Sequence, residues 1–430
     1  MKLQKRPICE GVNLNIIETD KFKTNYIAIN FITPLAENTA SLSTLLPAVL
    51  KRGCVKYPDI ASLQRRYDML CSTNVWAGSS KLGEAQIVKI GANMLDNRYV
   101  TDGTDILGGT IELIGDVLFS PLLENGAFRP DYVNQEKANQ IDAVKSIINN
   151  KGAYANVRCI EEMCRGELYS VASASVEMTE AITPESLYSH YLTLIKTAPV
   201  EIYFVGNCDF DALERKLAEI FTPYAHTPAP IPKTNVIRRA DSVREFVEEQ
   251  PVAQGKLSIG FRTGKVLDDG DYHIFATFCE LFGGSPAAKL FMNVREKLSL
   301  CYYCQAIPHA QKGVMVVASG IEVAKKDLAQ SEILAQLDDI CQGKITDEEF
   351  SAAKKSLING YKSIGDNADT IATWYMNRAY ASLDTSPEET AEKVMAVTVD
   401  DVIECAKNIT LDTVYFMKGT LLDKNESEEG

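Results

Sequence analysis

The stretch Ile182-Thr-Pro-Glu-Ser-Leu187 recurs 215 residues later as Val397-Thr-Val-Asp-Asp-Val402. In both copies the Thr is a good helix N-cap, and acidic residues follow in the first turn, where the helix dipole favours them. Each copy leads into a β-rich segment, at 200–206 and at 413–419. The spacing is half the length of the 430-residue chain, so the sequence predicts two similar domains in tandem.

The opening strands of the two halves also correspond, since Tyr26-Ile-Ala-Ile-Asn-Phe31 resembles Lys256-Leu-Ser-Ile-Gly-Phe261. Between the halves, the segment 223–232 has four prolines in ten residues, which exclude a helix or a central strand and favour an extended connector. We therefore expect an N-terminal domain over 1–222, a proline-rich linker over 223–250, a C-terminal domain over 251–422 and an acidic tail over 423–430.

Each half alternates short β-branched strands with long amphipathic helices, of which 132–148 and 347–364 are the clearest. Isolated strand-turn-strand signals followed by late helices are typical of α+β proteins. We expect each domain to be one sheet packed by helices on one face.

The bulk composition argues against several classes of function. The net charge of −14 and the pI near 5.0 disfavour binding to nucleic acid or to an anionic membrane, which needs clustered Lys and Arg. Eleven cysteines without a framework spacing fit a reducing compartment. The charged segment 1–9 has no apolar h-region, and no apolar stretch approaches the roughly 18 residues of a membrane span. We expect a cytoplasmic protein.

Cys301-Tyr-Tyr-Cys304 is the only C-x-x-C sequence in the chain. One such pair supplies at most two metal ligands. A redox pair usually opens a helix that follows a strand, where its thiol pKa is lowered. Because this pair lies in an aromatic, strand-like run, we expect two buried thiols, with a metal or redox role as the alternative.

A candidate binding constellation lies in the second half. Two adjacent glycines, Gly283 and Gly284, allow the backbone to approach a ligand or to turn sharply. Ser285-Pro286 then predicts a helix N-cap followed by proline at the first helical position, with the helix running to residue 297. The alternative for the glycines is a tight turn without a binding role.

Arg295 lies near the end of that expected helix, and its planar guanidinium can bind carbonyl oxygens. A phenol from the next strand could join it to hold a peptide carbonyl or an oxyanion. Residues of a strand alternate between its faces, so Tyr302 and Tyr303 cannot both point toward Arg295. The alternative is a surface ion pair for Arg295 and core packing for Tyr302.

The stretch from Gly283 to Tyr302 reads Gly-Gly-Ser-x-x-x-Lys-Leu-Phe-x-x-Val-Arg-Glu-Lys-Leu-Ser-Leu-x-Tyr. It resembles the C-terminal signature of the insulinase-type, M16 family of zinc metallopeptidases. The resemblance implies two homologous domains of the LuxS/M16 metallopeptidase-like type, each a sheet packed by helices, that close as a clamshell around an extended peptide. It also implies that Arg295 and Tyr302, with Gly283 and Gly284, bind the substrate.

The first half departs from this family at its metal site. Thr44-Leu-Leu-Pro47-Ala48 stands where the family has His-x-x-Glu-His, and the expected distal glutamate falls at Gln140-Ile-Asp142, which leaves at best an aspartate. The four histidines, at 190, 226, 273 and 309, are too far apart to share a helix face. We therefore expect no bound metal, no cofactor, no catalytic residue and no hydrolysis by this chain alone.

Several members of this family, such as the mitochondrial processing peptidase, divide zinc binding and substrate binding between two chains. The resemblance thus implies a non-catalytic, substrate-binding subunit that pairs with a paralogue carrying His-x-x-Glu-His, or forms a homodimer, and that binds a peptide. Two alternatives are a structural or assembly protein derived from a peptidase and a hydrolase with an unrecognised site. The residues that resemble M16-like proteins associated with 5-aminopentanol modification of elongation factor P are Glu136-Lys137, Asp142, Lys151-Gly-Ala-Tyr154-Ala, Arg158 and Cys164-Arg-Gly-Glu167.

Overall fold

The structure, a computed structural model, describes residues 2–224 and 226–421, and the acidic tail expected over 423–430 lies outside them. Its contacts divide the chain into two compact units, each of which combines segments from both halves of the sequence. Unit 1 contains the described residues within 1–145, 171–234 and 364–380, and unit 2 contains those within 146–170, 235–363 and 381–430. The segments 146–170 and 364–380 thus each belong to the unit that is built mainly by the other half.

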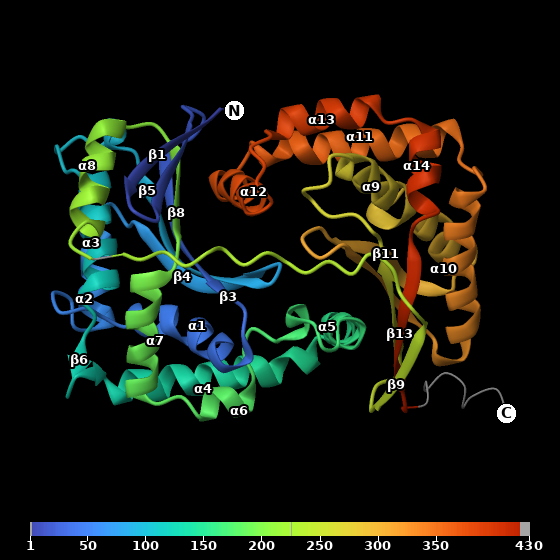
Figure 1. Cartoon of the computed structure of the whole chain (residues 1–430), viewed down its shortest axis with the longest axis horizontal. Coiled ribbons are helices and arrows are strands. Elements are labelled where there is room, and N and C mark those ends of the chain that lie inside the picture. Colours follow the sequence, from blue (N-terminus) through green and yellow to red (C-terminus); the bar gives the residue numbers. More distant parts are fainter. Residues whose placement is uncertain (1, 225, 422–430) are drawn as a thin grey trace. The chain divides into compact units, whose positions relative to one another are not determined.

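The sheet of unit 1 has the strand order β1-β2-β8-β3-β5-β4. Figure 1 labels β1, β8, β3, β5 and β4 of this sheet. Its strands are β1 (Leu3–Cys9), β2 (Val12–Glu18), β3 (Thr24–Pro34), β4 (Asn74–Leu82), β5 (Ala85–Leu95) and β8 (Val200–Gly206). β2 and β8 pair in parallel, whereas the other neighbours are antiparallel. The strand predicted at 200–206 is β8, and the one predicted at 26–31 lies within β3.

The sheet of unit 2 has the order β11-β12-β10-β13-β9. Its strands are β9 (Arg244–Gln250), β10 (Gly255–Arg262), β11 (Cys301–His309), β12 (Val314–Ile321) and β13 (Thr410–Gly419). Here β9 and β13 are the parallel pair, so β9-β13-β10-β12-β11 matches β2-β8-β3-β5-β4 strand by strand. The repeat is therefore confirmed. Residues 244–250, which we expected in the linker, form β9 because they are the counterpart of β2.

Helices cover one face of the unit 1 sheet and enclose the larger core of that unit. They include α1 (Glu37–Leu50), α2 (Ile60–Met69), α3 (Ile106–Phe119), α4 (Pro130–Ser146), α7 (Pro184–Thr197) and α8 (Phe210–Phe221). Shorter elements between them are η1 (Asn97–Tyr99), β6 (Leu123–Glu124), β7 (Ala127–Phe128) and α6 (Val176–Glu180). On the opposite face, α12 (Ala368–Tyr380) buries Ile371 and Tyr375 against Ala28 and Tyr203.

Unit 2 is built in the same way. One face of its sheet packs against α9 (Tyr272–Cys279), η4 (Glu280–Gly284), η5 (Leu290–Lys297), α10 (Lys326–Cys341), α11 (Asp347–Ile364) and α14 (Val399–Ala406). Further elements are η2 (Ile147–Asn149), η3 (Leu168–Ser170), η6 (Val323–Lys325) and α13 (Pro387–Ala396). The opposite face is covered by α5 (Lys151–Met163). None of the helices within 2–224 and 226–421 is long and apolar enough to cross a membrane.

Each sheet therefore has helices on both faces, whereas the sequence pattern indicated one. In the tandem halves, α5 follows α4 and α12 follows α11, so α5 and α12 occupy equivalent places in the repeat. Each of them packs on the sheet of the other half's unit. The two units are related by a reciprocal exchange of one helix, which a local sequence pattern cannot reveal.

The repeated N-caps behave as predicted. The Thr183 side chain accepts a hydrogen bond from the Ser186 amide at the start of α7, and Thr398 accepts one from Asp401 at the start of α14. Both are capping boxes, in which the residue three positions on bonds back to the cap. Each cap stabilises its helix by about 1 kcal/mol.

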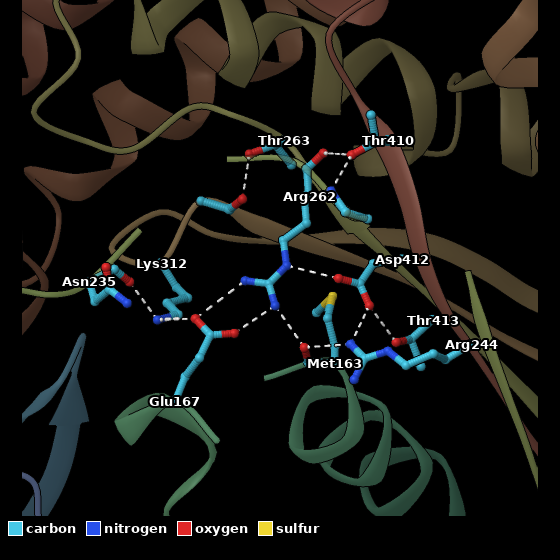
Figure 2. Close-up of polar contacts among 12 residues, drawn as sticks. Met163, Glu167, Asn235, Arg244, Arg262, Thr263, Lys312, Thr410, Asp412 and Thr413 are labelled. Atoms are coloured by element: carbon cyan, nitrogen blue, oxygen red, sulfur yellow. Dashed lines mark hydrogen bonds and ion pairs between the residues drawn. The ribbon is translucent and has the colours of Figure 1, made fainter. Parts of the chain in front are cut away.

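A buried charge cluster fastens the C-terminal end of α5 to the unit 2 sheet (Figure 2). The guanidinium of Arg262, on β10, lies 2.6 Å from Glu167 and 2.9 Å from Asp412, and the Lys312 ammonium lies 2.7 Å from the other Glu167 oxygen. Arg262 also donates to the Met163 carbonyl at 2.6 Å. Burial alone would raise the pKa of Glu167, but its hydrogen bonds to Arg262 and Lys312 hold that pKa below the ordinary value.

Candidate functional site

Helix α1 carries the altered zinc motif, and a hydrogen-bond network occupies its first position. Thr44 Oγ1 donates to the Ser173 carbonyl at 2.6 Å. It accepts from Ser79 Oγ at 3.1 Å and from Gln86 Nε2 at 3.0 Å. Through these hydrogen bonds the Thr44 hydroxyl links α1 to the loop before α6 and to the strands β4 and β5.

The other altered positions also lack metal donors. Pro47 lies inside α1, which continues past it, and neither the Pro47 ring nor the Ala48 methyl has an atom that can bind zinc. At the expected distal position on α4, Gln140 is buried and its Nε2 donates to the Ser41 carbonyl at 3.1 Å. Asp142, the carboxylate left from the sequence pattern, is exposed. The local chemistry is that of hydroxyls and amides.

Two of the histidines form hydrogen bonds with hydroxyl groups. His190 Nε2 lies 2.9 Å from the hydroxyl of the fully buried Ser43, and burial lowers the pKa of His190 to about 4. His309 Nδ1 lies 2.9 Å from the Tyr169 hydroxyl in unit 2. Across residues 2–224 and 226–421, no group of three His, Cys, Asp or Glu side chains is placed to hold a metal ion.

A cleft of about 600 Å³ opens beside the C-terminal end of α1. Ala48 lines it from α1, Arg52 from the turn after α1, Tyr67 from α2 and Val75 from β4. On its wall Arg52 Nε pairs with Glu136 at 2.5 Å. In the sheet that the described residues form, β4 is an edge strand. An edge strand has backbone groups to which an extended peptide can add.

Arg295 lies in η5, a π-helical segment. Its guanidinium carbon is 4.5 Å from the Phe291 ring centroid, and its Nε is 3.6 Å from Glu296. The Arg295 side chain is 40% exposed. Surface contacts of this kind contribute little to folding, and π-helical turns are frequent at functional sites. The guanidinium therefore remains accessible to a ligand.

Tyr302 lies at a β-bulge in β11. The residues on either side of it pair with consecutive residues of β12, so Tyr302 is an extra residue in the edge strand, and it is 55% exposed. Tyr303 lies on the α5 face of the sheet, since a Cβ added to Gly152 of α5 would be 2.9 Å from the Tyr303 hydroxyl. η5 packs on the other face. Of the two tyrosines, Tyr303 is thus turned away from the η5 face.

The two glycines end the π-helical η4, where the sequence indicated a loop. A Cβ at Gly283 would lie 2.7 Å from the backbone nitrogen of Ala306, so glycine allows η4 to pack directly on β11. Gly284 is exposed. The helix start predicted at Ser285-Pro286 is wrong. Ser285 is the extended C-cap of η4, and the next helix begins at Leu290, after a turn.

Sequence reasoning missed the network around Thr44 and the bulge at Tyr302. A signal for the network existed, because Gln86 is a polar residue in the mainly apolar segment 85–95. The bulge has no comparable signal, since it is defined by the register of β11 on β12.

Comparison with known proteins gives this geometry a family context. Residues 181–357 match the model of the Peptidase M16 inactive domain. The chain is 32% identical to the probable inactive metalloprotease YmfF of Bacillus subtilis (strain 168), over 95% of this chain and 96% of that protein. A conserved protein from Enterococcus faecalis V583 has a crystal structure that superposes with a TM-score of 0.90 at 28% identity, covering 98% of this chain and all of that one. A peptidase M16 inactive domain from Pseudomonas fluorescens shares the fold, with a TM-score of 0.80 at 17% identity over 99% of this chain and 100% of that one.

Proposed function

Because the chain belongs to the M16 peptidase family as an inactive homologue, we propose that it is the non-catalytic, substrate-binding subunit of a two-chain zinc endopeptidase. Its partner would be a paralogue that carries His-x-x-Glu-His and supplies the zinc. The observation that carries this proposal is a contrast within the chain. Thr44, at the position of the first zinc ligand, is held by hydrogen bonds within unit 1, whereas Tyr302 is exposed and the Arg295 side chain is partly exposed.

The chemistry of the second-half residues suits a peptide. The guanidinium of Arg295 offers several N–H donors in one plane, which can bind peptide carbonyl oxygens. The Tyr302 hydroxyl can donate to the same backbone. Tyr302 also lies in an edge strand, whose free side can pair with an extended segment. A protein that served only as a scaffold would need neither exposed side chain.

The test is co-expression with a His-x-x-Glu-His paralogue from the same genome, followed by a peptide-cleavage assay of the purified pair. We expect cleavage by the pair, none by this chain alone, and loss of cleavage in Arg295→Ala and Tyr302→Phe. Matched controls are Arg129→Ala and Tyr99→Phe, which alter a partly exposed arginine and an exposed tyrosine in unit 1. Both controls should cleave like the wild type.

Unchanged cleavage in Arg295→Ala and Tyr302→Phe would favour a structural or assembly protein instead. Size-exclusion chromatography of this chain alone and with the paralogue distinguishes a homodimer from a heterodimer. Cleavage by chelator-treated chain alone would point to an unrecognised hydrolytic site.

The proposal also covers the cellular location of the pair and the process in which it takes part. We place the pair in the cytoplasm and, on the finer resemblance around Glu136 and Glu167, associate it with the 5-aminopentanol modification of elongation factor P. Deletion of the gene should then reduce the modified fraction of elongation factor P, measured by intact-protein mass spectrometry. An unchanged modified fraction would refute the association with elongation factor P. The peptidase role would still be tested by the cleavage assay.

A further inference from the structure

Cys301 and Cys304 lie on either side of the bulge in β11. In a regular strand, residues three apart point to opposite faces. The extra residue, Tyr302, shifts this alternation, and both cysteines lie in the same hydrophobic core beneath η4 and η5. They are 8% and 4% exposed, so the expectation of buried thiols is confirmed. Their position on one face is a property that the bulge creates.

The two cysteines are neighbours on this face, because they pair with Ile321 and Ser319, which are only two residues apart on β12. The adjacent Cys304 thiol lowers the pKa of Cys301 despite the opposing effect of burial. The positive charge of Arg295 acts in the same direction. The adjacent Cys301 thiol, together with burial, raises the pKa of Cys304. The pair thus has one thiol that ionises first and a second thiol beside it.

Buried cysteines elsewhere in the chain lack this arrangement. Cys405 lies in the same core, and burial raises its pKa to about 12. Cys54 is fully buried in unit 1, and burial likewise raises its pKa. Thiolates are the reactive form of cysteine, so these two thiols are expected to be inert.

We propose that Cys301 and Cys304 form a redox-active dithiol, which a low-molecular-weight disulfide oxidises to an intramolecular disulfide. The Cys301 thiolate attacks one sulfur of the oxidant, forms a mixed disulfide and expels the first small thiol. Cys304 then loses its proton and attacks Cys301 Sγ, which expels the second small thiol. Two protein thiols are oxidised, the oxidant is reduced to two thiols, and both protons end on these products.

Closing this bond acts on Tyr302, which lies between the two cysteines. The sulfurs must approach to about 2.05 Å, which draws in the backbone on both sides of the bulge. The strand can accommodate this change because β11 is at the edge of the sheet that the described residues form. We infer that oxidation displaces Tyr302 and weakens peptide binding, and this consequence rests on the proposed function.

The chemical test uses the full-length protein and glutathione disulfide. Free thiols are then blocked with N-ethylmaleimide, and peptides are analysed by mass spectrometry. We expect the peptide with both cysteines to lose two hydrogens and to carry neither label. Cys304→Ser should retain glutathione on Cys301. In Cys301→Ser, glutathione should attach to Cys304 at least about tenfold more slowly than it attaches to Cys301 in Cys304→Ser. Cys71→Ser, which alters an exposed thiol, should not change closure of the pair.

The proposal is overturned if wild-type Cys301 and Cys304 both remain alkylated under conditions that attach glutathione to Cys71. The functional test compares oxidised and reduced protein in the partner-dependent cleavage assay. We expect cleavage to fall several-fold on oxidation and to recover with dithiothreitol. Disulfide formation with unchanged cleavage would refute the effect on Tyr302. If the two chains together fail to cleave when this chain is reduced, the proposed function is refuted. The redox activity of Cys301 and Cys304 is then judged by the chemical test alone.

Discussion

Glu167 and Arg262 form an ion pair with an oxygen–nitrogen distance of 2.6 Å, and their side chains are 7% and 3% exposed. Glu167 belongs to the first half of the sequence, whereas Arg262 lies on β10 in the second. The pair holds the segment after α5 on the unit 2 sheet. It therefore secures α5, which this unit takes from the other half of the chain.

Glu167→Ala should lower the free energy of unfolding of unit 2 by about 3–5 kcal/mol, because it removes a buried carboxylate that pairs with both Arg262 and Lys312. Hydrogen exchange in urea provides the measurement, with faster exchange expected first in α5. Asp131→Ala is the control, since its pair with Arg129 is largely exposed and should change stability by less than about 1 kcal/mol. Equal effects of the two substitutions would contradict the assignment.

His190 should make unit 1 less stable in acid. Its pKa is about 4 in the folded state, because of burial, against 6.5 as the ordinary value. Between these values the unfolded chain binds the extra proton, so stability falls as the pH drops from about 6.5 to about 4, by roughly 3 kcal/mol for this group. His190→Gln, compared with the wild type at pH 7, 5.5 and 4.5 by urea unfolding, should lack this part of the pH dependence. Parallel curves for the two proteins would show that His190 does not contribute.

Thr44→Val should destabilise unit 1 by about 1–3 kcal/mol, because the Ser173 carbonyl would lose the Thr44 donor and the Gln86 amide would keep only the Ala40 carbonyl of its two acceptors. Thermal and urea unfolding measure the loss. Thr193→Val is the matched control, since its exposed hydroxyl bonds only within α7, to the Ser189 carbonyl at 3.0 Å, and the change should stay within about 0.5 kcal/mol. A neutral Thr44→Val would mean that the network does not hold α1 in place.

Arg295→Ala and Tyr302→Phe should leave the stability of unit 2 within about 0.5 kcal/mol of the wild type, because Tyr302 is exposed and the partly exposed Arg295 makes only surface contacts. Urea unfolding of each variant checks this before any cleavage assay. A large loss of stability in either variant would assign that residue to the fold, and its effect on cleavage would then say nothing about substrate binding.

Local patterns predicted local structure well. The helix expected at 347–364 is α11, the strand expected at 200–206 is β8, and both repeated threonines cap helices. These features depend on side-chain periodicity and on caps within a few residues. Predictions failed where a distant contact decides. Ser285 is a residue type that favours the N-cap of a helix, yet it is the C-cap of η4. The packing of η4 on β11 determines where the chain turns.

In the candidate site, too, some features follow from local sequence and others depend on contacts between distant residues. The missing zinc ligands at Thr44, Pro47 and Ala48 are a matter of side-chain chemistry, which the sequence gives directly. The faces of Tyr302 and Tyr303 depend on the pairing of β11 with β12, because a one-residue bulge reverses the alternation that the sequence implies.

The sequence alone determined that the chain contains two similar α+β halves and that the zinc-motif positions 44, 47 and 48 have no zinc-binding side chain, because a repeat and the chemistry of a side chain follow directly from residue identity. Tertiary structure alone decided that α5 and α12 are exchanged between the units and that Cys301 and Cys304 share one face. These properties depend on which buried surfaces meet and on strand register, and both arise from contacts between residues that are distant in the chain.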